Sequence, residues 1–349
     1  MNNLKKIILC TLSLATFNSY ASSEQTHLPQ WTVSQLPNKA SLRGSAAVDN
    51  KLWVTGTKGS VYVSENLGQQ WRNVSPSQYK SLDFRDIHVF DKQTAIIMSV
   101  GSGDDSKLLK TQDGGNSWAL LYQNKDKEGF FDAIDFWDDK TGLMLGDPVD
   151  GYYVVKKTTD GGNTWRRIAK SKLPAIIEKE SAFAASGNTL IVGEEGKAWS
   201  TTGGFSASVY ESNDWGETWQ RQAVPLYSET QTAGGYGLAQ NTQGQIFVLG
   251  GDFQQRPAKY ANIATKLDTW YQVDAKERGL RTAMSCYESI CITTGKTGSD
   301  YSSDDGKTWQ PLDNLQAVEG DRGFYTLAND GNIFVSAGAE GKVGVLIVK

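Results

Sequence analysis

The sequence predicts an all-β protein, a seven-bladed β-propeller of four-stranded antiparallel blades, and two observations lead to that prediction. The first is an eight-residue cassette that returns five times, at 64–71, 111–118, 158–165, 212–219 and 302–309. Each copy reads Ser/Thr, any residue, Asp/Asn, any residue, Gly, two further residues and Trp. The second is the series of short alternating strands between copies, separated by turns that contain Gly. Self-similarity at a regular period indicates one supersecondary unit copied along the chain.

The cassette tryptophans define the period of the repeat. A four-stranded propeller blade takes about 40–50 residues. Each unit contains a first strand such as "RDIHVF", a second such as "KLWVTG", a third that runs into the cassette and a fourth that begins at its Trp. The spacing ranges from 39 residues (270 to 309) to 54 (165 to 219). The tryptophans are Trp71, Trp118, Trp165, Trp219 and Trp309, with a degenerate copy at Trp270.

The two ends of the chain together supply the seventh blade. After residue 322 the sequence has the pattern of three strands and no cassette Trp. Near the start, "PQWTVSQLP" looks like a fourth strand that begins at Trp31, 40 residues before Trp71. An N-terminal strand that joins the last blade closes the ring and removes exposed sheet edges. Six blades is the alternative count.

The cassette has the chemistry of a hairpin turn. An Asp side chain accepts hydrogen bonds from backbone N–H groups just ahead, and Gly supplies positive φ. The Trp provides a large apolar anchor between units. The motif resembles the Asp-box, or bacterial neuraminidase repeat, of sialidase-type propellers, in which the box is a structural turn on the face opposite the ligand site. The resemblance implies that the box side chains form turns and do not catalyse. They are Asn66, Asp113, Asp160, Asp214 and Asp304.

The first 21 residues resemble a signal peptide. Lys5 and Lys6 precede a short apolar stretch over 7–17, and a small-residue site follows at Ala21. We expect cleavage near Ala21, a periplasmic or secreted location, and a single propeller domain over 22–349. The apolar stretch is too short to span a bilayer, and no later stretch is long enough, so we expect no membrane span.

The charge excludes several classes of partner. The net charge of −4 becomes −6 when Lys5 and Lys6 are removed, whereas binding a nucleic-acid backbone needs a basic excess. The sequence has neither a dinucleotide or P-loop fingerprint nor zinc-ligand spacing. We therefore expect a monomer with no cofactor, no metal site and no nucleic-acid partner.

Two cysteines follow the leader, Cys286 and Cys291, in "SCYESIC". The four residues between them read as a tight turn joining two strands. In an oxidising compartment this arrangement favours a disulfide that closes a hairpin. Two reduced thiols are the alternative.

One face of the ring is predicted to gather charged residues. In a propeller the start of each first strand lies at one mouth of the central channel, opposite the cassette turns. Converging arginines there favour a carboxylate or other anion, because the planar guanidinium binds it bidentately. The alternative is that the charges pair with one another and line a watery channel. Alignment on the closing turns selects Arg43, Arg85, Asp132, Glu180 or Ser181, Gly235, Arg281, and Arg322 or Gly323, and the same-face loops add Asp147, Asp252 and Arg256.

Two functions are compatible with these features. The units "FRDIHVFD", "GLMLGD" and "TTDGGNTW" resemble the photosystem II stability/assembly factor family. That resemblance implies a non-catalytic, lumenal or periplasmic propeller that binds a partner protein and has an arginine patch on its surface. Together with the converging arginines, it predicts an exported propeller that binds a partner protein or an anionic, carboxylate-bearing ligand on its channel-mouth face. The alternative is a glycoside hydrolase of sialidase-like or two-carboxylate type. In that case Arg43, Arg85 and Arg281 would imitate the sialidase triad, with Asp86, Asp132 or Glu180 as acids, although the sialidase "RIP" sequence is missing.

Overall fold

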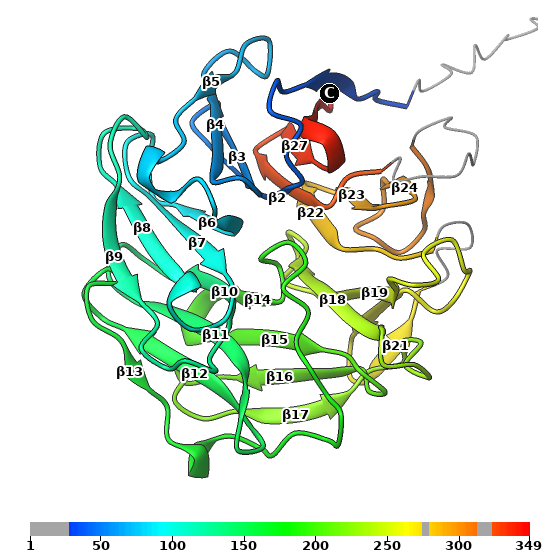
Figure 1. Ribbon diagram of the computed structural model, residues 1–349. Helices are drawn as coiled ribbons and strands as arrows, with labels where there is room; N and C mark the ends of the chain where they lie inside the picture. The colour runs from blue at the N-terminus through cyan, green and yellow to red at the C-terminus, as the bar shows by residue number, and fades with distance from the viewer. Residues whose placement is uncertain (1–27, 274–278, 313–322) are drawn as a thin grey trace, which may run out of the picture.

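A computed structural model describes residues 28–273, 279–312 and 323–349. Within these ranges the strands form seven four-stranded antiparallel sheets arranged around a common centre (Figure 1). The predicted seven-bladed all-β propeller is therefore confirmed, and the alternative count of six is not needed. In blades 1 to 6 the chain order of the strands is also their spatial order.

Each blade runs from an inner strand at the ring centre to an outer strand at the rim. Blade 1 contains β2 (Leu42–Val48), β3 (Lys51–Gly56), β4 (Ser60–Ser64) and β5 (Arg72–Asn73); blade 2, β6 (Asp83–Val89), β7 (Ala95–Val100), β8 (Lys107–Thr111) and β9 (Ala119–Gln123); blade 3, β10 (Phe131–Phe136), β11 (Gly142–Val149), β12 (Tyr152–Thr158) and β13 (Arg166–Arg167); blade 4, β14 (Leu190–Val192), β15 (Ala198–Thr202), β16 (Ser208–Ser212) and β17 (Gln220–Ala223).

Blade 5 contains β18 (Ala233–Gln240), β19 (Ile246–Asp252), β20 (Ile263–Lys266) and β21 (Trp270–Gln272); blade 6, β22 (Ala283–Tyr287), β23 (Ile290–Gly295), β24 (Gly298–Ser302) and β25 (Gln310–Pro311); blade 7, β26 (Thr326–Asp330), β27 (Ile333–Ala337), β28 (Lys342–Ile347) and β1 (Thr32–Gln35). Five short 3₁₀ turns connect strands: η1 (Ser77–Tyr79), η2 (Gly103–Asp105), η3 (Lys170–Lys172), η4 (Glu194–Gly196) and η5 (Ala339–Gly341).

The N-terminal strand closes the ring as predicted. β1 pairs antiparallel with β28, with Thr32 opposite Val345 and Gln35 opposite Lys342. The Trp31 ring packs against Phe324 with centroids 5.0 Å apart. The last blade is thus built from both ends of the chain, which removes the open edge that three C-terminal strands would leave.

The hydrophobic core lies between blades. Each pair of neighbouring blades shares one cluster of buried side chains. The second strands β3 and β7 are buried at every residue, because a neighbouring blade covers each face of their sheet. For the same reason β7 is a nearly continuous apolar run in the sequence.

The five cassettes fold as the same turn. In the second copy, Oδ1 of Asp113 accepts hydrogen bonds from the Thr111 hydroxyl (2.8 Å) and the Ser117 N–H (2.9 Å), while Oδ2 accepts from the Ser117 hydroxyl (2.6 Å). These bonds lower the pKa of Asp113 to about 2. Asp160 repeats the pattern with Thr158 and Thr164. The remaining copies centre on Asn66, Asp214 and Asp304.

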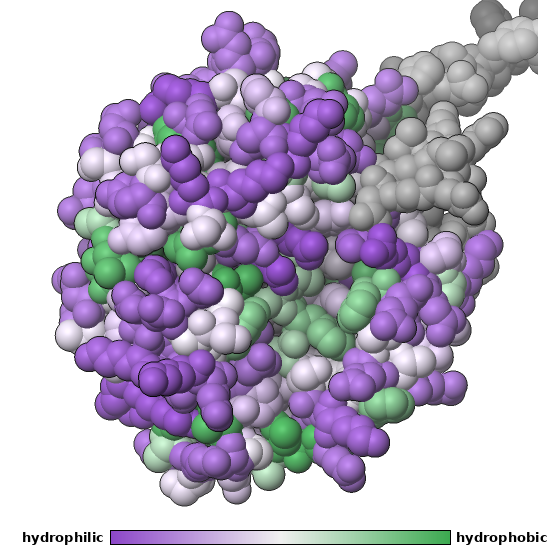
Figure 2. Space-filling view, viewed as in Figure 1, coloured by the Kyte–Doolittle hydropathy of each residue, from purple (hydrophilic) through white to green (hydrophobic). Residues whose placement is uncertain are grey.

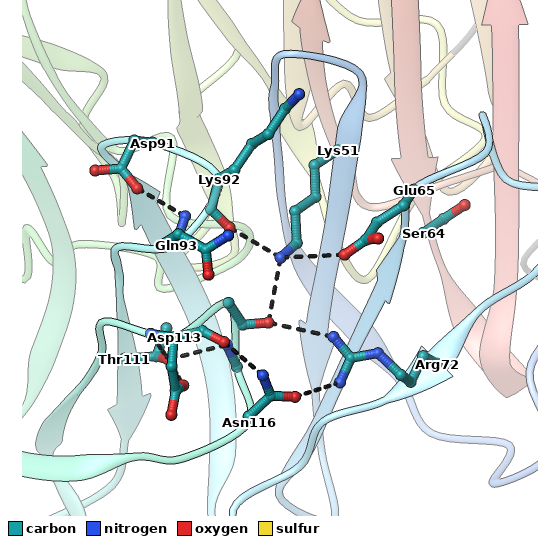
Figure 3. A network of polar contacts seen from close by, with 12 residues as sticks. Lys51, Ser64, Glu65, Arg72, Asp91, Lys92, Gln93, Thr111, Asp113 and Asn116 are labelled. Carbon is teal, nitrogen blue, oxygen red and sulfur yellow. Dashed lines mark hydrogen bonds and ion pairs between the residues drawn. The ribbon is translucent and has the colours of Figure 1, made fainter.

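Near the cassette turns, a buried lysine holds two blades together (Figure 3). Nζ of Lys51 donates to the carbonyl oxygens of Lys92 (2.9 Å) and Gly114 (3.2 Å), and lies 3.6 Å from a carboxylate oxygen of Glu65. Arg72 donates to Gly114 and Asn116 of the same neighbouring blade. Burial lowers the pKa of Lys51, so the bonds to carbonyl dipoles compensate for lost hydration. These contacts join blades 1 and 2.

Blade 4 departs from the predicted pattern. Its inner strand, expected from Ser181 onward, is interrupted: Ser181 forms an isolated bridge with Gly203, and continuous pairing begins only at β14. Between these points residues 182–188, which we call the plug, leave the sheet. The segment that leads to the plug runs in front of blade 4 toward the ring centre in Figure 1.

The two cysteines form the predicted disulfide. Cys286 of β22 and Cys291 of β23 occupy opposite positions in one hairpin, with Cα atoms 4.1 Å apart.

Candidate functional site

All seven blades contribute to one pocket at the channel mouth. The pocket has a volume of about 470 Å³ and is lined by Arg43 of blade 1, Arg85 of blade 2, Asp132 of blade 3, the plug of blade 4, Tyr236 of blade 5, Thr282 of blade 6 and Tyr325 of blade 7. Figure 2 shows apolar side chains gathered in a hollow near the centre of the ring, with hydrophilic side chains around it. Because every blade contributes lining residues, the pocket forms only when the ring is closed.

The plug forms the floor of this pocket. Gly187 has φ +77°, and its Cα lies so close to Asp86 that an added Cβ would be 2.2 Å from Oδ1 of that side chain. Ser186 donates to the carbonyl of Thr282 in blade 6, and the N–H of Leu238 in blade 5 donates to the carbonyl of Asn188. The plug therefore crosses the channel and is held from several blades.

Two arginines bind the plug and face the pocket. Nη1 of Arg85 donates to the carbonyl of Ala184 (2.9 Å), and its Nε donates to Asp83 (2.8 Å). Nη1 of Arg43 donates to the carbonyl of Ala185 (3.4 Å). A guanidinium has five N–H donors, so Arg85 retains donors for a ligand while it holds the floor.

Further cations complete a positively charged rim. The guanidinium carbon of Arg43 and Nζ of Lys296 each lie 4.9 Å from the ring centre of Tyr325. Arg256 also lines the pocket, and its Nε donates to the carbonyl of Phe253 (3.0 Å). The lining thus contains four cations and two carboxyl groups, Asp132 and Asp147.

These two carboxyl groups form a desolvated pair. Asp132 is 1 % exposed, and its Oδ2 has no hydrogen-bond partner among the described residues. Burial, and secondarily the neighbouring Asp147, raises the pKa of Asp132 well above its usual range, against the lowering effect of Arg85. Burial also raises the pKa of Asp147 to about 6. Both shifts favour the neutral carboxyl form relative to an ordinary exposed aspartate.

One wall of the pocket is aromatic. Phe183 of the plug stacks on Tyr236 with ring centroids 4.4 Å apart, and Phe253 meets Phe183 edge-on at 6.4 Å. Phe253 is 39 % exposed at the rim. The pocket can therefore take a ligand that combines an anionic group with apolar or aromatic surface.

The structure brings together five of the predicted site residues: Arg43, Arg85, Asp132, Asp147 and Arg256. Arg281 is elsewhere, because its fully buried guanidinium pairs with Asp300 within blade 6 (Nε to Oδ2, 2.8 Å). Asp252 is also buried, where it accepts hydrogen bonds from the hydroxyls of Thr230 and Thr232. Neither lines the pocket. Arg322 lies outside the described residues.

Two other predicted acids are buried away from the pocket lining. Asp86 accepts hydrogen bonds from the N–H groups of Ile87 and Ile134, and burial raises its pKa to about 7. Glu180 accepts from the Ile177 N–H and the hydroxyls of Thr202 and Tyr210. Both connect structural segments.

Sequence reasoning missed the plug, Lys296 and Tyr325. The small residues of "AFAASGN" were a usable signal, because a segment that crosses a crowded channel needs little side-chain volume. Lys296 lies in the turn between β23 and β24, and Tyr325 comes two residues after the aligned position Gly323, so neither stands at an aligned position. Among residues 28–273, 279–312 and 323–349, no group of three or more His, Cys, Asp or Glu is placed to hold a metal. No helix within those ranges has the length and apolarity of a membrane span.

Comparison with known structures gives the same architecture. A structure described as YCF48 bound to D1 peptide matches 91% of this chain and 95% of that chain, with 15% identity and a TM-score of 0.67. YCF48 from Cyanidioschyzon merolae matches 91% of this chain and 98% of its own, at 15% identity and TM-score 0.65. These likenesses show the fold.

An enzyme is also similar in fold. The GH74 enzyme of Niastella koreensis matches 87% of this chain with 11% identity and a TM-score of 0.60, and this chain spans only 52% of that enzyme. No protein-family model and no curated protein matches the sequence. The assignment of function therefore depends on the site.

Proposed function

We propose that this chain is a non-catalytic propeller that binds an anionic segment of a partner protein in the channel-mouth pocket. The observation behind the proposal is the convergence of Arg43, Arg85, Arg256 and Lys296 on one aromatic-walled pocket. Guanidinium groups bind carboxylates bidentately, and the aromatic wall accepts an adjacent apolar side chain. The structure described as YCF48 bound to D1 peptide supports the proposal, because a propeller of similar fold binds a peptide.

We also propose that the chain acts outside the cytoplasm as a monomeric single domain over 22–349, after removal of a leader that ends near Ala21. The segment 1–27 lies outside the described residues, so the proposal depends on the sequence pattern alone. Mass spectrometry of the mature protein from its source tests it, with a first residue near Ser22 as the expected result.

Glycoside hydrolysis is the second candidate, because the acid pair has the raised pKa of a general acid. Geometry disfavours it. A catalytic carboxyl must touch the glycosidic oxygen or the sugar carbon, yet Asp132 is 1 % exposed and both Asp86 and Glu180 are engaged by structural hydrogen bonds. Of the acids considered, only Asp147 has substantial access.

The experiment begins with a displayed library of random twelve-residue peptides selected on the wild-type protein. We then synthesise the best binder, called the selected peptide, and measure its Kd by calorimetry for wild type, Arg85→Ala and Lys296→Ala. Lys307→Ala is the matched control, because Lys307 is an exposed cation of the blade 6 cassette. We expect at least tenfold weaker binding in both pocket variants and no change in the control.

Parallel assays with sialosides and glucans test catalysis. Turnover by wild type that disappears in Asp132→Asn or Asp147→Asn would overturn the proposal in favour of a glycosidase. Selected peptides that bind all pocket variants equally would show that the pocket is not the binding site.

A further inference from the structure

A second opening adjoins the channel-mouth pocket. It has a volume of about 290 Å³, and Phe130 lines both spaces. Its other walls include Phe131 of β10, Lys156 of β12 and Arg167 of β13. The two spaces therefore meet across one side chain at the entrance to blade 3.

The same opening continues into a larger groove on the outside of the ring. This groove, of about 1150 Å³, runs beside β9 and shares Tyr122, Asn124, Lys125 and Trp165 with the opening. It extends from Gly103 of η2 to Asn163 in the cassette of blade 3. The shared lining residues place the three spaces next to one another, from the channel mouth past Phe130 to the rim of blade 2, where Figure 1 places β9.

The path has a rigid aromatic wall. The rings of Tyr122 and Phe131 stack with centroids 6.1 Å apart, and Tyr122 lies 6.3 Å from Trp165. Nζ of Lys156 donates to the Tyr122 hydroxyl (3.0 Å) and lies 5.5 Å from the Phe131 ring centre. These contacts hold the wall in place before any ligand arrives, which lowers the entropy lost on binding.

The edge of blade 2 suits an extended chain. β9 has five residues, whereas the other outer strands have two to four, and it pairs with β8 alone among the described strands. Leu120 in this strand is 46 % exposed. At about 3.3 Å per residue, five residues of an extended partner would follow the strand along its length.

The charges indicate the partner's composition. The walls carry Lys125, Lys127, Lys156 and Arg167, against Asp104 and Asp126. Within the described ranges none of these four cations has a carboxylate at ion-pair distance. An acidic segment would complement them.

We propose that an extended acidic peptide segment, anchored in the channel-mouth pocket, continues over Phe130 and along the groove beside β9. This inference rests on the proposed function, because the pocket supplies the anchor. The groove supplies affinity and sequence preference beyond the anchor. A compact ligand would fill the pocket alone and leave the groove empty, so the two modes differ in their dependence on ligand length.

The test compares three synthetic forms of the selected peptide. The first is the full twelve residues, and the second is the half that binds the channel-mouth pocket, called the anchor half. The third is the full length with every Asp and Glu outside the anchor half changed to Asn or Gln. Kd is measured for wild type, for the double variant Lys125→Glu/Arg167→Glu, and for Lys307→Glu as a matched charge reversal at a distant cassette. Lys125 and Arg167 are both exposed, so their replacement should not disturb the core.

We expect the full peptide to bind wild type about fivefold to tenfold more tightly than either the anchor half or the neutralised peptide, which is the range for a few exposed ion pairs. The double groove variant should remove that gain and leave binding of the anchor half unchanged, while Lys307→Glu changes nothing. Equal affinity of all three peptides, or an unaffected double variant, would overturn the groove while the pocket stands.

The remaining outcomes concern the anchor. In one outcome the groove variant loses the affinity that the acidic residues add, while Arg85→Ala binds the full peptide as tightly as wild type does. That result would retain a groove site and overturn the anchored path. Failure of the library to yield any peptide that binds wild type would overturn both proposals. Selective binding of glucan oligosaccharides along the groove would replace the peptide with a carbohydrate ligand.

Discussion

The close approach of the plug to the channel wall gives the sharpest stability prediction. Gly187 has φ +77°, and a Cβ there would lie 2.2 Å from Oδ1 of Asp86. Asp86 cannot easily withdraw, because its two carboxyl oxygens accept hydrogen bonds from separate backbone N–H groups in blades 2 and 3. Gly151 offers a matched control: its φ is +79°, and an added Cβ would meet nothing within 4 Å.

The two substitutions separate conformational strain from the clash. An alanine in the left-handed region costs about 1 kcal/mol relative to glycine, so Gly151→Ala should lower the free energy of unfolding by about 1 kcal/mol. Gly187→Ala adds a displacement of the plug, which weakens the hydrogen bonds from Arg43 and Arg85 to its carbonyls. A hydrogen bond to a charged group contributes about 1.5–3 kcal/mol. We expect a total loss of about 3 kcal/mol.

Urea unfolding followed by tryptophan fluorescence measures both losses. The double variant Asp86→Ala/Gly187→Ala provides a further check, because removing the carboxyl removes the atoms that the new Cβ would strike. Its destabilisation should be smaller than the sum of the two single losses. Equal losses for Gly187→Ala and Gly151→Ala, together with an additive double variant, would refute the close approach.

Three further predictions follow from buried or hydrogen-bonded charges. Burial raises the pKa of Asp86 to about 7, so the contribution of this carboxyl group to stability is complete below about pH 4 and is lost as the pH rises through about 7. Asp86→Asn should therefore reduce the fall in the free energy of unfolding between pH 4 and 8. An unchanged slope would contradict this. Asp160→Ala removes three turn hydrogen bonds and should cost about 1–2 kcal/mol in urea unfolding without changing the Kd of the selected peptide. Asp300→Asn removes the carboxylate that pairs with the buried Arg281 and should cost about 3–5 kcal/mol, whereas a loss below about 1 kcal/mol would show that the pair is dispensable.

The architecture could be predicted because each blade repeats the same local signals. The cassette carboxylates make only local hydrogen bonds, as Asp113 does with Thr111 and Ser117, so the sequence pattern suffices to identify the turn. The same regularity located Arg43, Arg85 and Asp132 at one mouth. The prediction that the Arg281 side chain lines this mouth was wrong. Alignment identifies a position on a strand, but it does not say whether the side chain there pairs with a buried partner such as Asp300.

The sequence by itself determined the blade count, the order of strands and the face opposite the cassettes, since these depend on short-range patterns repeated along the chain. Only the tertiary structure decided what closes the channel and what surrounds the pocket. The plug packs closely against Asp86 of another blade at Gly187, and the Tyr325 ring contacts both Arg43 and Lys296 because the propeller brings blades 1, 6 and 7 together. Such contacts join residues far apart in the chain, so no local pattern encodes them.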